Sequence, residues 1–336
     1  MQHSKHVRAC VWLFAATAVW GLSFPFIKAI LLVQENLVPG VPSIFLAALM
    51  AAVRFAVAGA VIALFSFRTL RHLTKLELQQ GLGLGFFGGL GILFQMDALA
   101  HTTASTSAFL TQFYCLIIPI WVAWRQRALP KFAVAISSIM VLAGVAVLSH
   151  FDWREFKMGR GEAETILAAI FFAGQILWLE RPRYTPNRVT HFTVVMFGAI
   201  TVLVLPVAFF TAPHARVFLD AYSSREVLAL IAVITFGCTL LAYMVMNVWQ
   251  PHVTATEAGL IYCVEPIYAS LFASFLPALL SHFARIDYPN EHITRHLLIG
   301  GGLITAANVL IQIEAMRQRW KAAGTERTNA TADRRP

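Results

Sequence analysis

The sequence predicts an all-α integral membrane protein whose ten transmembrane helices form two inverted five-helix repeats. Ten long apolar segments fill most of the 336 residues, and only short loops separate them. Hydrophobic residues make up 58% of the chain, charged residues 13%, and the mean hydropathy is +0.67, whereas soluble domains carry about 25% charged residues. A helix of about 20 apolar residues crosses the roughly 30 Å hydrocarbon core of a bilayer. These observations disfavour a water-soluble protein.

Each expected span is long enough to cross the bilayer while satisfying its own backbone hydrogen bonds. The expected spans are residues 10–33, 46–67, 80–100, 103–124, 131–149, 164–181, 190–211, 225–248, 254–280 and 296–316. They divide the chain into a cytoplasmic N-terminal arm (1–9), a first repeat (10–149), a connecting outer loop (150–163), a second repeat (164–316) and a cytoplasmic tail (317–336).

The basic residues indicate a membrane topology and not a nucleic-acid interface. The formal net charge is +9, but the Lys and Arg residues lie between spans, whereas a nucleic-acid-binding domain gathers them on one folded face. Most of them fall in loops on the side that holds both termini, and such loops are cytoplasmic by the positive-inside rule. We therefore expect a multi-pass inner-membrane protein with both termini in the cytoplasm and no nucleic-acid partner.

The two halves of the chain are weakly similar at the start of the fourth and ninth spans. Residues 103–110 align with residues 253–260, and Pro119 aligns with Pro266 further along. Because each half has five spans, the second copy enters the membrane from the opposite side, as in transporters that bind ligand near the midplane between inverted repeats. Chance similarity among small and hydroxyl residues is the alternative.

Several short motifs resemble those of EamA-type permeases of the drug/metabolite transporter superfamily. The motifs are Trp20-Gly21-Leu22-Ser23-Phe24 with Lys28, Arg54-Phe55, the run 98–105 leading to Phe109 and Pro119, and Glu265-Pro266. The resemblance covers all ten spans. It implies an inner-membrane carrier of small metabolites or drugs, commonly an exporter and often thought to exchange substrate against protons. Asp97 departs from the pattern, where a small or neutral residue is expected.

Glu265 is the first candidate for a proton- or cation-binding group. It lies near the middle of the ninth span, directly before Pro266, and an ionisable group inside a span costs about 2.5–3.5 kcal/mol on insertion scales. Glu265 is therefore expected to have either a function or a bonding partner that offsets this cost. The alternative is a structural carboxylate bonded to backbone groups that the proline frees.

Lys28, Arg54 and Asp97 predict a buried charge cluster in the outer halves of the first three spans. Arg54 and Asp97 can pair, and Lys28 can join them or reach the outer surface. Direct contact with a carboxylate- or phosphate-bearing substrate is the alternative.

Glycine and proline residues mark close packing and helix breaks. Gly81, Gly85 and Gly89 recur every fourth residue and predict a ridge on which another helix packs closely, with an exposed backbone along a substrate path as the alternative. Residues with helix-breaking potential near the expected midplane are Pro25, Pro119 and Pro266.

Neutral polar and aromatic residues within the spans predict a cavity for a small amphipathic molecule. The candidates are Trp20, Gln95, Phe109, Gln112, Tyr114, Gln175, Asn247, Tyr262 and Tyr268. Hydrogen bonding between helices is the alternative for each of them.

The motifs of an intramembrane enzyme are missing from the sequence. It contains no HExxH and no GxSxG, and its histidines fall in loops or at span edges. We expect no catalysis, no metal and no cofactor. A non-catalytic scaffold or receptor stays open as an alternative. The favoured prediction is a secondary transporter of a small molecule by alternating access, with protons as the candidate coupling ion and export expected from the resemblance alone.

Overall fold

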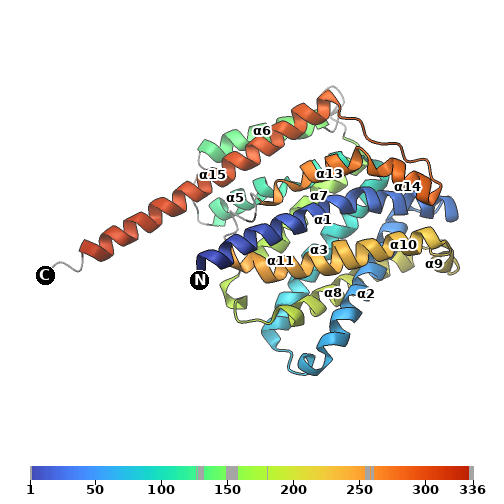
Figure 1. The fold of residues 1–336 in the computed structure, drawn as a ribbon, viewed down its shortest axis with the longest axis horizontal. Helices are drawn as coiled ribbons and strands as arrows, with labels where there is room; N and C mark the ends of the chain where they lie inside the picture. The colour runs from blue at the N-terminus through green and yellow to red at the C-terminus, as the bar shows by residue number, and fades with distance from the viewer. Residues whose placement is uncertain are drawn as a thin grey trace.

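The computed structural model is a bundle of helices, and no strand occurs among the residues it describes, which are 2–125, 127, 132–148, 158–179, 181–253, 258 and 261–332 (Figure 1). The connecting segment 150–157, and residues 254–257, 259 and 260 of the similarity between the halves, lie outside this part of the chain.

The described residues of the N-terminal half form six helices. They are α1 (Gln2–Leu37), α2 (Ser43–Leu70), α3 (Lys75–His101), α4 (Ala104–Thr111), α5 (Tyr114–Arg125) and α6 (Phe132–Leu148).

The described residues of the C-terminal half form long helices and short helical segments. They are α7 (Arg160–Leu179), η1 (Pro182–Tyr184), α8 (Val189–Thr211), α9 (Val217–Asp220), α10 (Arg225–Val233), η2 (Ile234–Leu241), α11 (Ala242–Trp249), η3 (Gln250–His252), α13 (Glu265–Ala273), α14 (Leu276–Ala284) and α15 (Arg295–Ala332). The continuous rod α10–η2–α11 includes a π-helical segment, η2.

Six helices of the described chain are long and apolar enough to cross a membrane. They are α1, α2, α3, α7, α8 and the rod α10–η2–α11, and the pair α13 and α14, bent by 53°, makes a seventh if it is one span. Many large apolar side chains are exposed, among them Leu64, Phe65 and Phe210, whereas soluble monomers rarely expose large apolar patches. The structure therefore supports an all-helical membrane protein, and the count of ten spans stays a prediction.

The helices of the structure differ in several places from the expected spans, while the expected domain bounds stay a prediction. The fourth expected span is broken at Gln112 and Phe113, between α4 and α5. The ninth is broken at Cys263 and Val264, before α13, and again between α13 and α14. The expected N-terminal arm is helical from Gln2, and α15 continues to Ala332 through most of the expected tail. Nothing in the apolar pattern marks these changes, because a broken helix and a continuous one can share the same hydropathy.

Side-chain caps fix the start of several helices. The hydroxyl of Thr74 accepts a hydrogen bond from the Glu77 backbone N–H (3.2 Å), and the Glu77 carboxylate accepts one from the Thr74 backbone N–H (2.8 Å). This reciprocal capping box begins α3. Thr103 begins α4 in a similar way, through its hydroxyl and the backbone N–H of Thr106 (3.0 Å).

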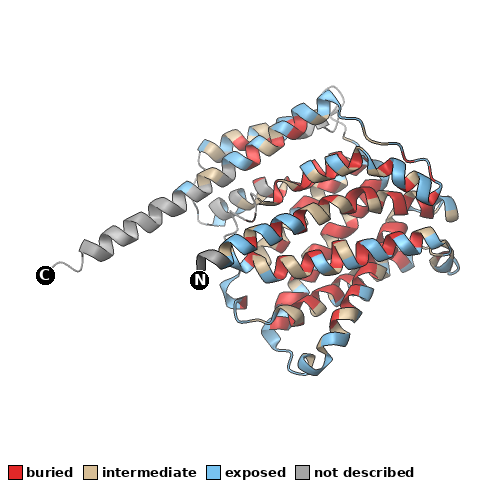
Figure 2. Cartoon of the chain, in the orientation of Figure 1, coloured by how far each residue is buried: buried red, intermediate tan, exposed pale blue. Residues whose placement is uncertain are grey.

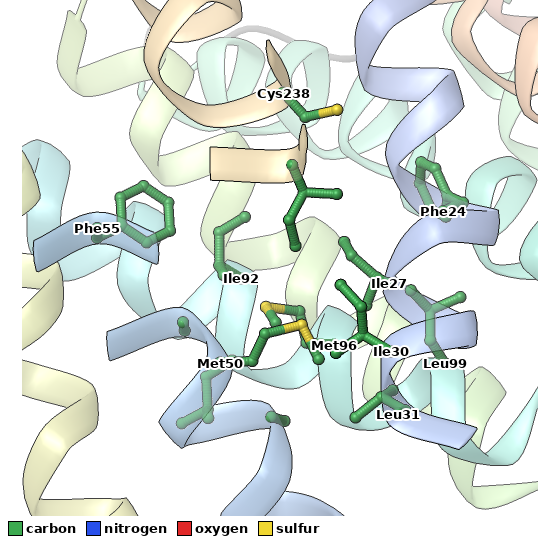
Figure 3. Close-up of a cluster of buried hydrophobic side chains, with 14 of the residues drawn as sticks. Phe24, Ile27, Ile30, Leu31, Met50, Phe55, Ile92, Met96, Leu99 and Cys238 are labelled. Carbon is green, nitrogen blue, oxygen red and sulfur yellow. The ribbon is translucent and has the colours of Figure 1, made fainter. Parts of the chain in front are cut away.

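Buried residues line the inward faces of the helices, and exposed ones cover the outside (Figure 2). The core includes apolar side chains from α1, α2, α3 and η2, such as Phe24, Met50, Met96 and Cys238 (Figure 3). α6 pairs with α15 at one edge of the bundle (Figure 1).

The glycine ridge of α3 lies against α8. A Cβ atom at Gly81 would come within 2.5 Å of the Val195 Cβ, and one at Gly85 within 2.5 Å of the Ala199 Cβ. At Gly89 the nearest atom, Leu203 Cδ2, is 3.4 Å away. The close approach of α3 and α8 therefore depends on the first two glycines.

The bundle has two ends. The basic end is where α2 ends and α3 and α8 begin, and the far end is where α1 and α3 end and α7 begins.

Candidate substrate cavity

A cavity of about 90 Å³, the central cavity, lies among helices of both halves. α1, α2, α3, α4 and α5 contribute lining residues from the first half, and α7, η2, α11 and α13 contribute them from the second. Predicted residues in its lining are Trp20, Gln95, Tyr114, Gln175 and Tyr262, together with Arg54 and Glu265. The other lining residues are Ser23, Ile27, Ile92, Thr111, Phe172, Ile176, Cys238, Tyr243 and Met246. Figure 3 shows Ile27, Ile92 and Cys238 from this lining.

Arg54 brings a buried positive charge to the central cavity. Its side chain is 2% exposed, and its Nε and Nη2 atoms donate hydrogen bonds to the Thr239 hydroxyl at 3.0 and 2.8 Å. Its Nη1 lies 3.7 Å from the Met96 sulfur. Within the described chain, the ion pairs closer than 4.0 Å do not include Arg54. A buried guanidinium without a close counter-ion is costly, so this charge calls for an anionic partner.

The π-helical segment η2 supplies the acceptor for Arg54. The Thr239 hydroxyl donates to the Ile234 carbonyl, five residues earlier, at 3.0 Å, so one hydroxyl accepts from the guanidinium while it satisfies a carbonyl of the widened turn. π-Helical turns occur often at functional sites.

Glu265 places a carboxyl group in the same cavity. Its side chain is 9% exposed, and the Gln112 amide reaches its Oε2 at 3.5 Å and donates to the Tyr262 carbonyl at 3.2 Å. Glu265 is the first residue of α13, and Pro266 lies in the first turn, where a proline costs no helical hydrogen bond. The helix is broken at Cys263 and Val264, directly before Glu265, so Pro266 lies beside a helix break and in the first turn of α13.

Three aromatic rings form one wall of the central cavity. Trp20 meets Tyr243 at a ring-centroid distance of 5.6 Å and Tyr262 at 5.7 Å, both edge to face. Gln95, also in the lining, donates to the Thr111 hydroxyl at 2.9 Å. The lining thus combines apolar rings with a few polar groups, as small-molecule sites do.

A larger cavity of about 440 Å³, the vestibule, lies at the basic end between η1, η3 and the ends of α7, α8 and α11. Asn247 and Gln250 line the vestibule, whereas Met246 and Tyr262 line the central cavity. The Tyr262 hydroxyl donates to Gln250 Oε1 at 2.9 Å. This hydrogen bond therefore joins a residue of one cavity to a residue of the other.

At the far end, ion pairs hold α3 against α7. Asp97, which is 1% exposed, pairs with Arg160, and Arg160 also pairs with Glu164 at 2.7 Å. The Thr102 hydroxyl donates to Glu162 at 2.7 Å. The structure therefore pairs Asp97 with Arg160, where the sequence suggested Arg54. The reason is that Arg160, expected in a loop, begins α7.

The segment between α14 and α15, which includes Glu291, also packs against the far end of the bundle. The carboxylate of Glu291 accepts hydrogen bonds from the backbone N–H groups of Ala104 (2.8 Å) and Ser105 (3.2 Å), at the start of α4. Lys28 donates to the Thr102 carbonyl close by. Lys28 thus belongs to this closure and not to a cluster with Arg54.

At the basic end, Glu77 joins α3 to α8. Its side chain is 2% exposed and accepts hydrogen bonds from the backbone N–H of Arg188 (3.1 Å) and from Arg188 Nε (2.8 Å), with His191 Nδ1 at 3.1 Å. Glu77 was not predicted from the sequence, although the Thr74-x-x-Glu77 capping box was a usable signal.

The remaining predicted residues lie outside the lining of the central cavity. Phe109 packs in a second apolar cluster and its ring lies against Gly301, Asn247 donates to Thr193 at 2.9 Å, and the Tyr268 ring meets Phe14 at 5.6 Å. Pro25 lies within the continuous α1, and Pro119 lies in α5. Thr239, Tyr243 and Gln250 were not predicted from the sequence either. Thr239 and Tyr243 are single polar groups in an apolar span, which give no sign of the face they occupy, and Gln250 lies beyond the end of that span.

Comparison with known proteins supports a transport role. No family model matches the chain. A protein of Archaeoglobus fulgidus described as an uncharacterized transporter is 25% identical over 310 residues, which cover 91% of this chain and 88% of that protein. A solved structure titled only "Crystal structure of protein" is similar in fold, with a TM-score of 0.54 and 16% identity, over 90% of this chain and 99% of the other. The chain is thus similar in sequence to a transporter over most of its length.

Proposed function

We propose that this protein is a secondary active transporter that moves a small molecule bearing an acidic group through the central cavity by alternating access. The observation that carries the proposal is the buried Arg54 guanidinium, which lines a cavity between the two halves without a carboxylate within 4.0 Å in the described chain. An acidic group on the substrate would supply the missing counter-charge. The aromatic wall around Trp20 would cover its apolar part.

The two ends of the bundle support alternating access. The far end is closed by the Asp97–Arg160 pair and by Glu291 on α4, whereas the vestibule at the basic end is separated from the central cavity by the contact of Tyr262 with Gln250. Breaking one closure while keeping the other would expose the cavity to one side at a time. By the positive-inside rule, the basic end would face the cytoplasm of an inner membrane.

The proposed architecture is ten spans in two inverted repeats. Its support is that helices break at related places in the two halves: at Gln112 and Phe113 before α5, and at Cys263 and Val264 before α13. Discontinuous helices of this kind surround the ligand in inverted-repeat transporters. The Gln112 amide, at the first break, reaches the Tyr262 carbonyl and Glu265 at the second.

Glu265 is the proposed proton-binding group. The proposed direction of transport is export of the substrate in exchange for protons, and this direction rests on the resemblance to EamA-type permeases. A carboxyl group that is buried in a cavity, with one amide as its described polar contact, can gain and lose a proton as the cavity changes access.

A comparison of metabolites tests the transport role. Small molecules are measured in the medium and inside the cells of four strains. One strain lacks the protein, one overproduces the native chain, one overproduces Arg54→Gln, and one overproduces the control Arg216→Gln. The exposed Arg216 lies directly before α9. We expect an acidic metabolite to accumulate outside with the native chain and the control, and not with Arg54→Gln. Equal profiles in all four strains would argue for a scaffold or receptor.

The proton role is tested with that metabolite in proteoliposomes that contain a trapped pH indicator. Exchange predicts that outward movement of the metabolite acidifies the lumen, and Glu265→Gln should abolish this pH change while leaving binding of the metabolite measurable. A pH change that persists in Glu265→Gln would remove Glu265 from the coupling.

A further inference from the structure

A groove of about 540 Å³ lies between α3 and the end of α7 on the outside of the bundle. Its lining residues are Gln79, Leu82, Gly83, Phe86, Phe87, Trp178 and Arg183. It shares none of them with the central cavity or the vestibule. The transport proposal leaves this groove without a role.

The shape of the groove depends on a glycine and an indole. A Cβ atom at Gly83 would come within 2.0 Å of the Trp178 ring, so the indole lies directly on the backbone of α3. Phe87 supports Trp178 from the side, with ring centroids 6.0 Å apart. On the outer face, Leu82 and Phe86 are about half exposed, so the floor of the groove is apolar and open to lipid.

The polarity of the groove changes along α3. Lys75 and Gln79 are one turn apart at the basic end, and Leu82 and Phe86 follow on the same side of the helix. Arg183 closes the basic end of the groove, and its guanidinium lies 4.6 Å from the Tyr184 ring centroid. Arg181 lies 3.7 Å from the ring centroid of Trp178. No lining residue is acidic, and in the described chain no carboxylate lies within 4.0 Å of Arg183.

We propose that this groove binds one anionic phospholipid, with the phosphate at Arg183 and an acyl chain over Leu82 and Phe86. The charge of the rim and the apolar floor match the two parts of such a lipid, and basic pockets between transmembrane helices bind anionic head groups. Trp178 lies in the last turn of α7 and Tyr184 in η1, at the basic end of the bundle, and aromatic side chains at the ends of membrane spans commonly lie at the head-group level. The proposal does not depend on the transported substrate.

Native mass spectrometry of the full chain in detergent tests this site, with phosphatidylglycerol and phosphatidylcholine as the added lipids. We expect one saturable phosphatidylglycerol with clear preference over phosphatidylcholine. Arg183→Gln should weaken its binding roughly fivefold, from about 1 kcal/mol for one basic residue at an anionic lipid surface. Arg216→Gln, an exposed arginine outside the groove, is the matched control and should bind like the native chain.

A second pair of variants tests the acyl chain. Leu82→Gln should weaken phosphatidylglycerol binding, and Leu64→Gln, an exposed leucine of α2 outside the groove, should not. Glycerol phosphate, which lacks acyl chains, should not compete at equal concentration. Each variant must keep the elution volume and melting temperature of the native chain, and a less polar exchange, Leu82→Ala, replaces Leu82→Gln if that variant fails to fold.

Three results would overturn the proposal: equal binding of the two lipids, equal weakening by Arg183→Gln and Arg216→Gln, or displacement by glycerol phosphate. The last result would identify a site for free phosphate compounds. None of these outcomes bears on the central cavity.

Discussion

Replacing Thr239 by valine should destabilise the protein by removing the acceptor on which the Arg54 guanidinium rests. Thr239 accepts two hydrogen bonds from Arg54, at 3.0 and 2.8 Å. Hydrogen bonds between membrane helices average about 0.6 kcal/mol, and charge-assisted ones are about twice as strong as neutral ones. Two such bonds sum to about 2 kcal/mol. Valine keeps the shape of the side chain, so the loss reports on the hydroxyl.

The control for Thr239→Val is Thr201→Val. The Thr201 hydroxyl donates to the Phe197 carbonyl at 2.9 Å, a bond within its own helix that resembles the one from Thr239 to Ile234, but no arginine approaches it in the described chain. Unfolding in a detergent and denaturant titration should give a difference of about 2 kcal/mol between the two variants. The double variant Arg54→Met/Thr239→Val completes a double-mutant cycle. If Thr239→Val costs no more than Thr201→Val, the hydroxyl does not stabilise the buried charge and the account of Arg54 fails.

Three further changes test other contacts. Gly85→Ala should cost about 1–3 kcal/mol of unfolding free energy through overpacking on α8, whereas Gly237→Ala, with open space around its Cβ position, should be nearly neutral; equal melting temperatures would contradict the ridge. Tyr262→Phe should speed labelling of a cysteine introduced at Gln95 from the vestibule side, and an unchanged rate would mean that its hydroxyl does not close the cavity. Glu291→Ala should lower the free energy of unfolding by about 0.5–2 kcal/mol, the usual range for a lost helix cap, and no change in melting temperature would show that the cap is dispensable.

The apolar pattern predicted the helical class because burial in lipid and intrahelical hydrogen bonding act on each segment separately. It could not locate the breaks before α5 and α13, since residues such as Gln112 and Glu265 reveal their partners only when the two halves meet. Arg54 illustrates the same limit on prediction of the cavity. The energetic cost of burying a charge predicted that Arg54 has a partner or a function. The sequence could not predict its hydroxyl partner, because Thr239 lies 185 residues away in a local distortion of the helix.

That distortion has a consequence for the geometry of the bundle. A π-helical turn is in effect one extra residue inserted into an α-helix, and each residue of an α-helix turns the chain by about 100°. If the same residues of Ile234–Leu241 wound as a regular α-helix, the extra residue would instead rotate everything after it by about 100°, so that Tyr243 and Met246 would turn away from the directions they now face. The rod can therefore direct Thr239 toward Arg54 of α2, and Tyr243 and Met246 into the central cavity, only because it contains one π-helical segment.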